Sequence, residues 1–335
     1  MTPLLSIVIP SNNRTDLLDQ ALRSILADPG FDDQCEVCIS DNSSSEGTCQ
    51  LMEKTYAATP RVRYRRSLDS PSLDENVNQA ITMGAGEYAW VFGDDDLIVP
   101  GFLTQLLGHL SKTKPGIVLI NSRSFEKCGI IEETRVPRGE IAVFGPGDND
   151  AFLAEFGGYL TYVPCLVIRR ELWRRSFRRE KIGTFFAHID AVYRAKPGVT
   201  AHFLPHPGIS MRMHHQTWAA RHFEIWNIHY PAVIWALEGY SAAAKRVVIP
   251  EFPLQSLKRI LGSRAYGRFN FAIWRAVLRH SRHASLAVKI FGFMIALLPR
   301  ELFRLLYIGY IRLKRRHHET GFSPQLALAQ LGRKK

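Results

Sequence analysis

Short apolar, β-branched segments alternate with helix-patterned segments along residues 1–120. Apolar runs of this kind are typical of strands buried on both faces of a parallel sheet. Strands that alternate with helices at this spacing form a parallel sheet with crossover helices. We therefore expect an α/β, Rossmann-like fold in which a mostly parallel sheet is flanked by helices. The expected strands are Leu4–Pro10, Glu36–Ser40, Val62–Arg65, Tyr88–Phe92 and Ile117–Asn121.

Polar side chains follow three of these strands at the point where each strand ends. They come after Pro10, at Asp41 and at Asp94–Asp96. Ligands of open parallel sheets bind outside the carboxyl ends of the strands. The three clusters therefore predict one binding site at that edge of the sheet.

The run Asp94-Asp95-Asp96 places three carboxylates side by side after a buried strand. Such charges repel one another unless they hold a cation or face solvent. Hard oxygen ligands suit Mg²⁺ or Mn²⁺, which would bridge them to a diphosphate, and a solvated acidic turn is the alternative. Asp41 can accept hydrogen bonds from a base or from ribose hydroxyls, or it can form a turn with the residues that follow it.

Charge is distributed unevenly along the 335 residues, whose formal net charge is +12. Residues 1–120 hold 9 Lys and Arg against 16 Asp and Glu, so the excess of basic residues lies in the remainder. This asymmetry indicates a polyanionic partner for the C-terminal part, such as nucleic acid, anionic lipid or a phosphate-bearing substrate. Because no nucleic-acid-binding motif or aromatic platform is present, we expect no nucleic-acid partner.

The C-terminal part, residues 221–335, is basic and helix-patterned. Within residues 286–316, large apolar residues alternate with Lys and Arg, and Pro299 divides two expected helices. This composition is typical of helices in the membrane interface, with packing against the catalytic domain as the alternative. The N-terminus has no signal-peptide pattern, and no apolar run approaches a spanning length. We therefore expect a cytoplasmic protein, peripheral on the inner face of the plasma membrane.

Three motifs together resemble glycosyltransferase family 2. They are residues 6–14, Ser-Ile-Val-Ile-Pro-Ser-Asn-Asn-Arg, residues 39–44, Ile-Ser-Asp-Asn-Ser-Ser, and residues 86–96, which end on Phe-Gly-Asp-Asp-Asp. The Phe-Gly-x-Asp-Asp form is similar to the O-antigen sugar transferases of that family, such as abequosyltransferase. The resemblance implies the GT-A fold over residues 1–220, with a nucleotide-sugar half (1–120) and an acceptor half (121–220), followed by a helical basic extension (221–335).

The resemblance also implies roles for residues of the donor site. Pro10, Ser11, Asn13 and Arg14 would line the nucleotide pocket, Asp41 would bind the base or ribose, and Asp95 would hold the metal. Gly93 stands where the family usually has Asp, so either the affinity for the metal is low or Asp94 and Asp96 share that task. Asn76 and Asn78 precede the acidic strand and would line the donor site, unless they are surface polar positions of a helix.

Transfer to a sugar hydroxyl requires one general base, whereas the metal stabilises the leaving diphosphate. His188 and Asp190 are the candidates, and because residues two apart on a helix face different ways, only one is expected in the site. A late His or Arg that reaches the metal or diphosphate would be His214 or Arg212.

These features predict an inverting glycosyltransferase that moves a sugar from a nucleotide-sugar donor to a lipid-linked or polysaccharide acceptor. The alternative is a catalytically inactive family member that binds nucleotide sugar or serves as a membrane-bound assembly partner. Gly93 and the absence of the family's Glu-Asp pair near His188 keep that alternative open. A nucleotidyltransferase is disfavoured because the N-terminal region lacks a Gly-rich, basic phosphate loop.

Overall fold

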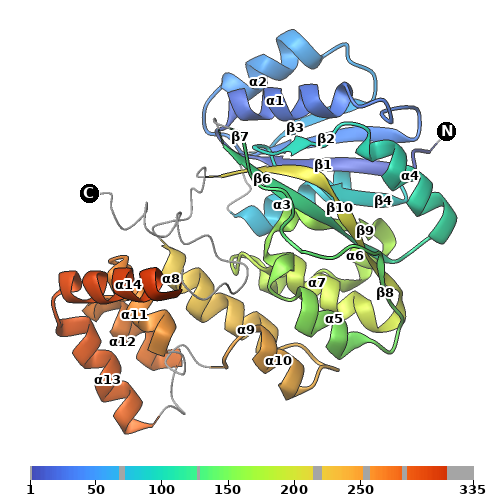
Figure 1. The fold of residues 1–335 in the computed structure, drawn as a ribbon. Coiled ribbons are helices and arrows are strands. Elements are labelled where there is room, and N and C mark those ends of the chain that lie inside the picture. Colours follow the sequence, from blue (N-terminus) through green and yellow to red (C-terminus); the bar gives the residue numbers. More distant parts are fainter. Residues whose placement is uncertain are drawn as a thin grey trace. The chain divides into compact units, whose positions relative to one another are not determined.

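The computed structural model describes residues 2–67, 72–126, 129–213, 221–251, 257–280 and 285–314. The chain divides into two compact units. Unit 1 comprises residues 1–215 and 237–244, and unit 2 comprises residues 216–236 and 245–335. Figure 1 shows a sheet with flanking helices in the first unit and helices in the second.

Unit 1 is built on one mixed sheet with the strand order β3-β2-β1-β4-β9-β6-β10-β5, while β7 pairs with β6 and β8 with β10. Strands β3, β2, β1 and β4 run parallel, as do β6 and β10, whereas β9 is antiparallel to both β4 and β6. The strands are β1 (Leu5–Ser11), β2 (Cys35–Asp41), β3 (Val62–Arg66), β4 (Tyr88–Val91), β5 (Leu97–Ile98), β6 (Ile117–Glu126), β7 (Gly129–Glu132), β8 (Ala142–Phe144), β9 (Leu166–Arg169) and β10 (Ala201–Arg212).

Successive residues of a strand point to opposite faces of the sheet. In this sheet helices cover both faces. Leu5, Ile7 and Ile9 pack with the apolar faces of α1 and α4 in one core cluster. Ser6 points to the other face, where its hydroxyl accepts a hydrogen bond from Gly86 N at 2.9 Å in the turn after α3. The helices of this unit are α1 (Thr15–Leu26), α2 (Gly47–Leu51), α3 (Leu73–Met83), α4 (Phe102–Thr113), α5 (Asn149–Phe156), α6 (Arg170–Ser176) and α7 (Ala187–Ala195), with short turns η1 (Met52–Tyr56), η2 (Tyr159–Thr161), η3 (Val163–Cys165), η4 (Arg179–Lys181) and η5 (Lys196–Gly198).

This arrangement confirms the predicted α/β fold with a mostly parallel sheet. It also confirms the helical C-terminal region, which consists of α8 (His222–Glu224), η7 (Ile225–His229), α9 (Tyr230–Trp235), α10 (Ala242–Val248), α11 (Leu257–Ala265), α12 (Phe271–His280), α13 (Leu286–Leu297) and α14 (Arg300–Lys314). Pro299 stands between α13 and α14, as expected. Within the part of the chain that the structure describes, no helix is both long and apolar enough to cross a membrane.

Candidate functional site

The acidic turn follows β4 at the carboxyl edge of the parallel strands. Phe92 N donates to Val8 O at 2.9 Å, so the chain still runs beside β1 after β4 has ended. Asp94 Oδ2 then accepts a hydrogen bond from Ser11 Oγ at 3.1 Å and from Asn12 N at 3.3 Å. The structure thus brings together the loops after β1 and β4, whose residues lie about 80 positions apart in sequence.

One guanidinium group lies between the first two aspartates of this turn. Arg14 Nη1 is 2.9 Å from Asp94 Oδ1 and 2.8 Å from Asp95 Oδ2. The side chains of Arg14 and Asp95 are each 20% exposed, and that of Asp94 is 8% exposed. Burial raises the pKa of Asp94 to about 6, against the opposing charge of Arg14. Arg14 therefore supplies the positive charge that these two carboxylates face within the protein.

The third aspartate connects the turn to Tyr162 and to the end of β10. Asp96 is buried, and its Oδ2 accepts a 2.5 Å hydrogen bond from the Tyr162 hydroxyl. Its Oδ1 accepts one from Arg212 N at 3.0 Å. Burial, and next the charge of Asp95, raises the pKa of Asp96 to about 7. Both oxygens of Asp96 already accept hydrogen bonds from protein groups. Asp95 is therefore more accessible to a metal ion than Asp96 is.

Gly93 is explained by the position of Asp96. A Cβ atom at residue 93 would stand 2.7 Å from Asp96 Oδ2 and 3.3 Å from Asp95 Oδ1. Any side chain there would push against a buried carboxylate. The glycine therefore belongs to the way this turn folds.

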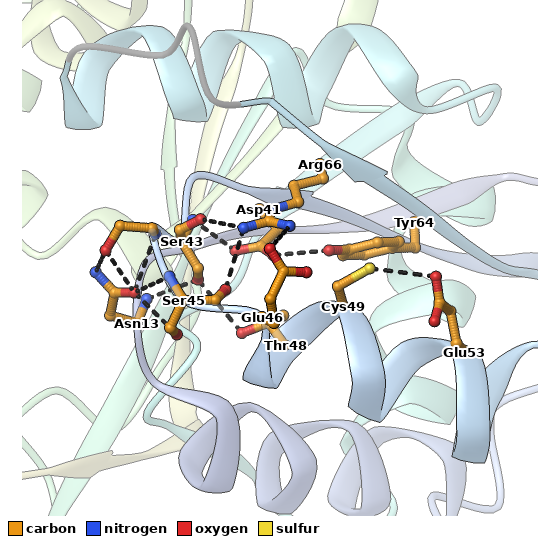
Figure 2. A network of polar contacts seen from close by, with 11 residues as sticks. Asn13, Asp41, Ser43, Ser45, Glu46, Thr48, Cys49, Glu53, Tyr64 and Arg66 are labelled. Atoms are coloured by element: carbon orange, nitrogen blue, oxygen red, sulfur yellow. Dashed lines mark hydrogen bonds and ion pairs between the residues drawn. The ribbon is translucent and has the colours of Figure 1, made fainter.

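Asp41 ends β2 beside the same edge, in register with Ser11 of β1. Its side chain is buried, with Oδ1 accepting from Ser43 N at 2.8 Å and Oδ2 from the Tyr64 hydroxyl at 2.7 Å. Burial, and next the hydrogen bond to Asp41, raises the pKa of Tyr64. Figure 2 shows these contacts from close by. Asp41 therefore forms the turn contact that one alternative predicted and also a contact across strands to Tyr64, while its binding of a base or ribose stays a prediction.

Asn13 connects the loop after β1 to the serine-rich loop after β2 (Figure 2). Its backbone has a positive φ of 55°, a conformation that Asn tolerates better than most residues. Asn13 N donates to Ser43 Oγ at 2.8 Å, and Asn13 Oδ1 accepts from Ser44 N at 3.1 Å and Ser45 N at 3.3 Å. The opposite side of the loop is held by Arg66, whose Nη1 is 2.7 Å from Glu46 Oε1.

Asn76 and Asn78 of α3 are buried and are not surface positions. Asn76 Nδ2 donates to Ser11 O at 3.1 Å, which places this residue next to the loop after β1. Asn78 Oδ1 accepts from Trp173 Nε1 at 3.1 Å. Asn76 thus lies beside the candidate site, whereas the Asn78 side chain supports the packing of α6.

His188 is buried in the first turn of α7. Its Nε2 lies 3.0 Å from Leu160 O, and a carbonyl only accepts, so this nitrogen carries the proton. Burial lowers the pKa of His188 to about 4. Leu160 lies two residues before Tyr162, so His188 contacts the segment that reaches Asp96.

Asp190 is fully buried in an ion pair with Arg178. Arg178 Nε is 2.9 Å from Asp190 Oδ2, and its Nη2 is 2.5 Å from Oδ1. Both oxygens therefore face one guanidinium. Among the described residues, no contact joins Asp190 to the acidic turn.

Of the two late candidates, Arg212 lies at the end of β10, and its Nε donates to Asp95 O at 3.0 Å. The Arg212 guanidinium also lies 4.8 Å from the centre of the Phe125 ring. His214 lies outside the described residues.

Two residues of this region were not predicted. Tyr162 supports Asp96, and Asp74 holds the segment that leads into α7. Asp74 accepts from Gly183 N and Phe185 N at 2.8 Å each and from Ala187 N at 3.1 Å. Asp74 stands two residues after Ser72, the N-cap of α3, so the pattern of a capped helix start could have drawn attention to it.

The chain is similar to several glycosyltransferases. The family model of Glycosyl transferase family 2 matches residues 6–152. Abequosyltransferase RfbV of Salmonella typhimurium is 27% identical over 224 residues, which are 62% of this chain and 66% of the relative. A GalNAc(5)-diNAcBac-PP-undecaprenol beta-1,3-glucosyltransferase of Campylobacter jejuni is 29% identical over 106 residues, 31% of this chain and 34% of that protein. The chain thus spans less than two thirds of either relative's length.

A solved structure has a similar fold. The mannosyltransferase PcManGT of Pyrobaculum calidifontis, in complex with GDP-Man and Mn²⁺, aligns with a TM-score of 0.53 at 16% identity, and the alignment covers 91% of this chain and 83% of that one. The sheet and its flanking helices therefore have the GT-A fold of glycosyltransferases. More particularly, residues 6–152 match the model of glycosyl transferase family 2, and this match begins at Ser6 in β1.

Proposed function

We propose that the chain is an active, inverting glycosyltransferase that moves a sugar from a nucleotide-sugar donor to a lipid-linked or polysaccharide acceptor. The observation that supports it most is the joining of three strand-end loops around Asp94, Arg14 and Asn13. The chain is similar to an abequosyltransferase and to a glucosyltransferase whose name includes a PP-undecaprenol-linked saccharide. This likeness supports a lipid-linked or polysaccharide acceptor.

The donor would bind at this edge through residues that the fold already holds in place. Asp41 and the serine-rich loop would meet the base and ribose, and Pro10, Ser11 and Arg14 would line the path to the diphosphate. Asn76 has a buried Oδ1 without a hydrogen-bond partner, and this atom lies beside the loop after β1. Such an acceptor suits a donor hydroxyl, because an unpaired buried oxygen is costly.

The acidic turn fits Mg²⁺ or Mn²⁺ by the chemistry of its oxygen atoms. Asp95 would hold the ion, with Asp94 and Asp96 adding negative charge nearby. Among the described residues, no three His, Cys, Asp or Glu side chains form a complete metal site, so the donor would supply further ligands. When bound, the ion would stabilise the charge of the leaving nucleoside diphosphate.

His188 is the better candidate for the base. Its proton is on Nε2, held by Leu160 O, so Nδ1 is the nitrogen that can accept the proton of the acceptor hydroxyl. A pKa of about 4 keeps the ring neutral at physiological pH. Asp190 would first have to leave Arg178.

We place the reaction at the cytoplasmic face of the plasma membrane, with the chain as a peripheral protein. A lipid-linked acceptor resides in the bilayer, whereas nucleotide sugars are dissolved in the cytoplasm. The basic helical region of residues 221–335 is the part that would meet the membrane.

An inactive family member remains the second candidate, because the Glu-Asp pair is absent. The experiment that separates the two incubates the purified full chain with a panel of UDP-, GDP-, CDP- and dTDP-sugars and a lipid-linked saccharide acceptor. Formation of a glycosylated lipid, with the anomeric configuration opposite to that of the donor by NMR, supports the proposal. A retained configuration contradicts inversion, and donor binding without product supports the inactive member.

A further inference from the structure

We infer that α13 and α14 form a bilayer-binding surface whose partner is an anionic membrane. This inference deepens the proposed function, because it names the residues that bring the chain to a lipid-linked acceptor. Binding to lipid needs neither donor nor catalysis, so it can be tested apart from the proposed function.

The outer side of α13 is a stripe of large apolar side chains that face solvent. The helix repeats every 3.6 residues, so positions three, four, seven and eleven apart lie on one side. The exposed residues follow this spacing and are Leu286 (72%), Ile290 (53%), Met294 (48%) and Leu297 (56%).

After the turn at Pro299, α14 carries a second set of exposed leucines. Leu302, Leu305 and Leu306 occupy positions three and four apart and are 46%, 69% and 61% exposed. Leu298, in the connection, is 38% exposed. Consecutive helices therefore present exposed leucines on both sides of one turn.

The opposite sides of the same helices are already used for folding. Ile295 and Ala296 of α13 and Phe303 of α14 are buried in the core cluster of unit 2, with Ile260, Phe269 and Val277. The exposed stripe is therefore distinct from the residues that stabilise the unit. Apolar side chains at this density outside a core mark an interaction surface, whereas singly exposed ones do not.

Charge decides which partner suits this surface. Unit 2 holds twenty Lys and Arg against four Asp and Glu. Lys289 on α13 and Arg300 at the start of α14 lie among the apolar residues in sequence, and Arg300 is exposed. Two copies of a unit with this excess of positive charge repel each other, which disfavours self-association. A bilayer offers hydrocarbon to the stripe and anionic headgroups to the basic residues.

The test is flotation of the full chain with vesicles of phosphatidylcholine containing phosphatidylglycerol, beside vesicles of phosphatidylcholine alone. We expect the wild type to float with the anionic vesicles and far less with the neutral ones. The variant Leu297→Ser/Leu302→Ser/Leu305→Ser should lower the partition coefficient by about a hundredfold or more, since each leucine withdrawn from hydrocarbon costs about a factor of ten.

The matched control is Ile141→Ser/Val143→Ser in and beside β8, where two apolar residues are 52% and 59% exposed. This variant should bind vesicles as the wild type does. Circular dichroism and donor turnover without lipid report that the leucine variant is folded. The inference is overturned if the wild type does not float, if the leucine variant floats equally well, or if light scattering shows a wild-type dimer that the leucine variant loses. Vesicle binding by a chain that transfers no sugar would leave this inference standing while the proposed function fails.

Discussion

Arg14 and Asp95 form an ion pair of 2.8 Å between the loop after β1 and the acidic turn after β4, and the same nitrogen of Arg14 lies 2.9 Å from Asp94. The Arg14 guanidinium thus lies beside Asp95, where a cation bound with the donor would also lie. A divalent ion at this turn would compete with Arg14 for the same carboxylates, and either positive charge would attract a diphosphate.

Replacement of Arg14 should separate these two effects. We expect Arg14→Ala to lower kcat/KM for the donor by about a hundredfold, since a positioned charge at a developing anion contributes on this scale. The same variant should bind Mn²⁺ about tenfold more tightly, because a competing positive charge has been removed. Steady-state kinetics and electron paramagnetic resonance measure the two quantities.

The control for Arg14 is Arg23→Ala, which removes a surface ion pair with Asp19 on α1, where the Arg23 side chain is 66% exposed. Its kinetics and Mn²⁺ affinity should equal those of the wild type. Wild-type turnover in Arg14→Ala would exclude this arginine from the donor site.

Gly93→Ala should destabilise the protein, because the added Cβ would stand 2.7 Å from Asp96 Oδ2. We expect the free energy of unfolding to fall by about 1–3 kcal/mol, and further for Gly93→Asp, which adds a fourth carboxylate. Denaturant unfolding measures the change.

Gly108→Ala on α4 is the control, since nothing lies within 4 Å of its added Cβ, and it should be neutral or slightly stabilising. Equal stability of Gly93→Ala and the wild type would contradict the crowding described for this turn.

Asp74→Ala should weaken acceptor use more than donor use. The variant loses the acceptor of three backbone N–H groups in residues 183–187, where Phe185 holds a positive φ of 69°. We expect a loss of about 2–3 kcal/mol in unfolding free energy and a higher KM for the acceptor, with donor hydrolysis changed less. Asp74→Asn should lose less than Asp74→Ala, because it retains one acceptor oxygen.

Asp32→Ala is the control, because the exposed Asp32 accepts from one backbone N–H, that of Gln34 at 2.8 Å. Its acceptor KM should match that of the wild type. An unchanged acceptor KM in a folded Asp74→Ala variant would separate this segment from acceptor binding.

His188 should make stability depend on pH in one direction. Its pKa in the folded protein, about 4, lies below the usual value of 6.5, because burial disfavours the charged ring. The free energy of unfolding is therefore unaffected by this ring above pH 6.5. It falls by about 3 kcal/mol as the pH falls toward 4, because the buried ring must then take up a proton. The stability difference between the wild type and His188→Asn should shrink as the pH falls. The control is His206→Asn, which removes a histidine whose side chain is exposed. A constant difference for His188→Asn would contradict the buried, neutral ring.

The strands and the main helices could be predicted from sequence because they rest on local patterns. The predicted strand Leu4–Pro10 differs from β1 by one residue at each end, and Val62–Arg65 differs from β3 by one residue. The helix that carries Asn76 and Asn78 begins at Leu73, so Asp74 lies in its first turn.

The contacts of the site could not be predicted, because they join segments far apart in sequence. Tyr162 reaches Asp96 and Asp74 reaches Gly183, across more than 60 and 100 positions. The choice between His188 and Asp190 likewise depended on their partners. The pairing of Asp190 with Arg178 follows from how η4 and α7 pack, which no local pattern reveals.

The most direct measurement of the proposed activity is release of nucleoside mono- or diphosphate from a panel of UDP-, GDP-, CDP- and dTDP-sugars, with Mg²⁺ or Mn²⁺, for the wild type and Asp95→Ala side by side. We predict metal-dependent release from one donor by the wild type and loss of that release in Asp95→Ala, with donor binding by calorimetry in the wild type. Silence of the wild type across the panel with an acceptor supplied and no donor binding, or full activity of Asp95→Ala, would contradict catalysis at the acidic turn.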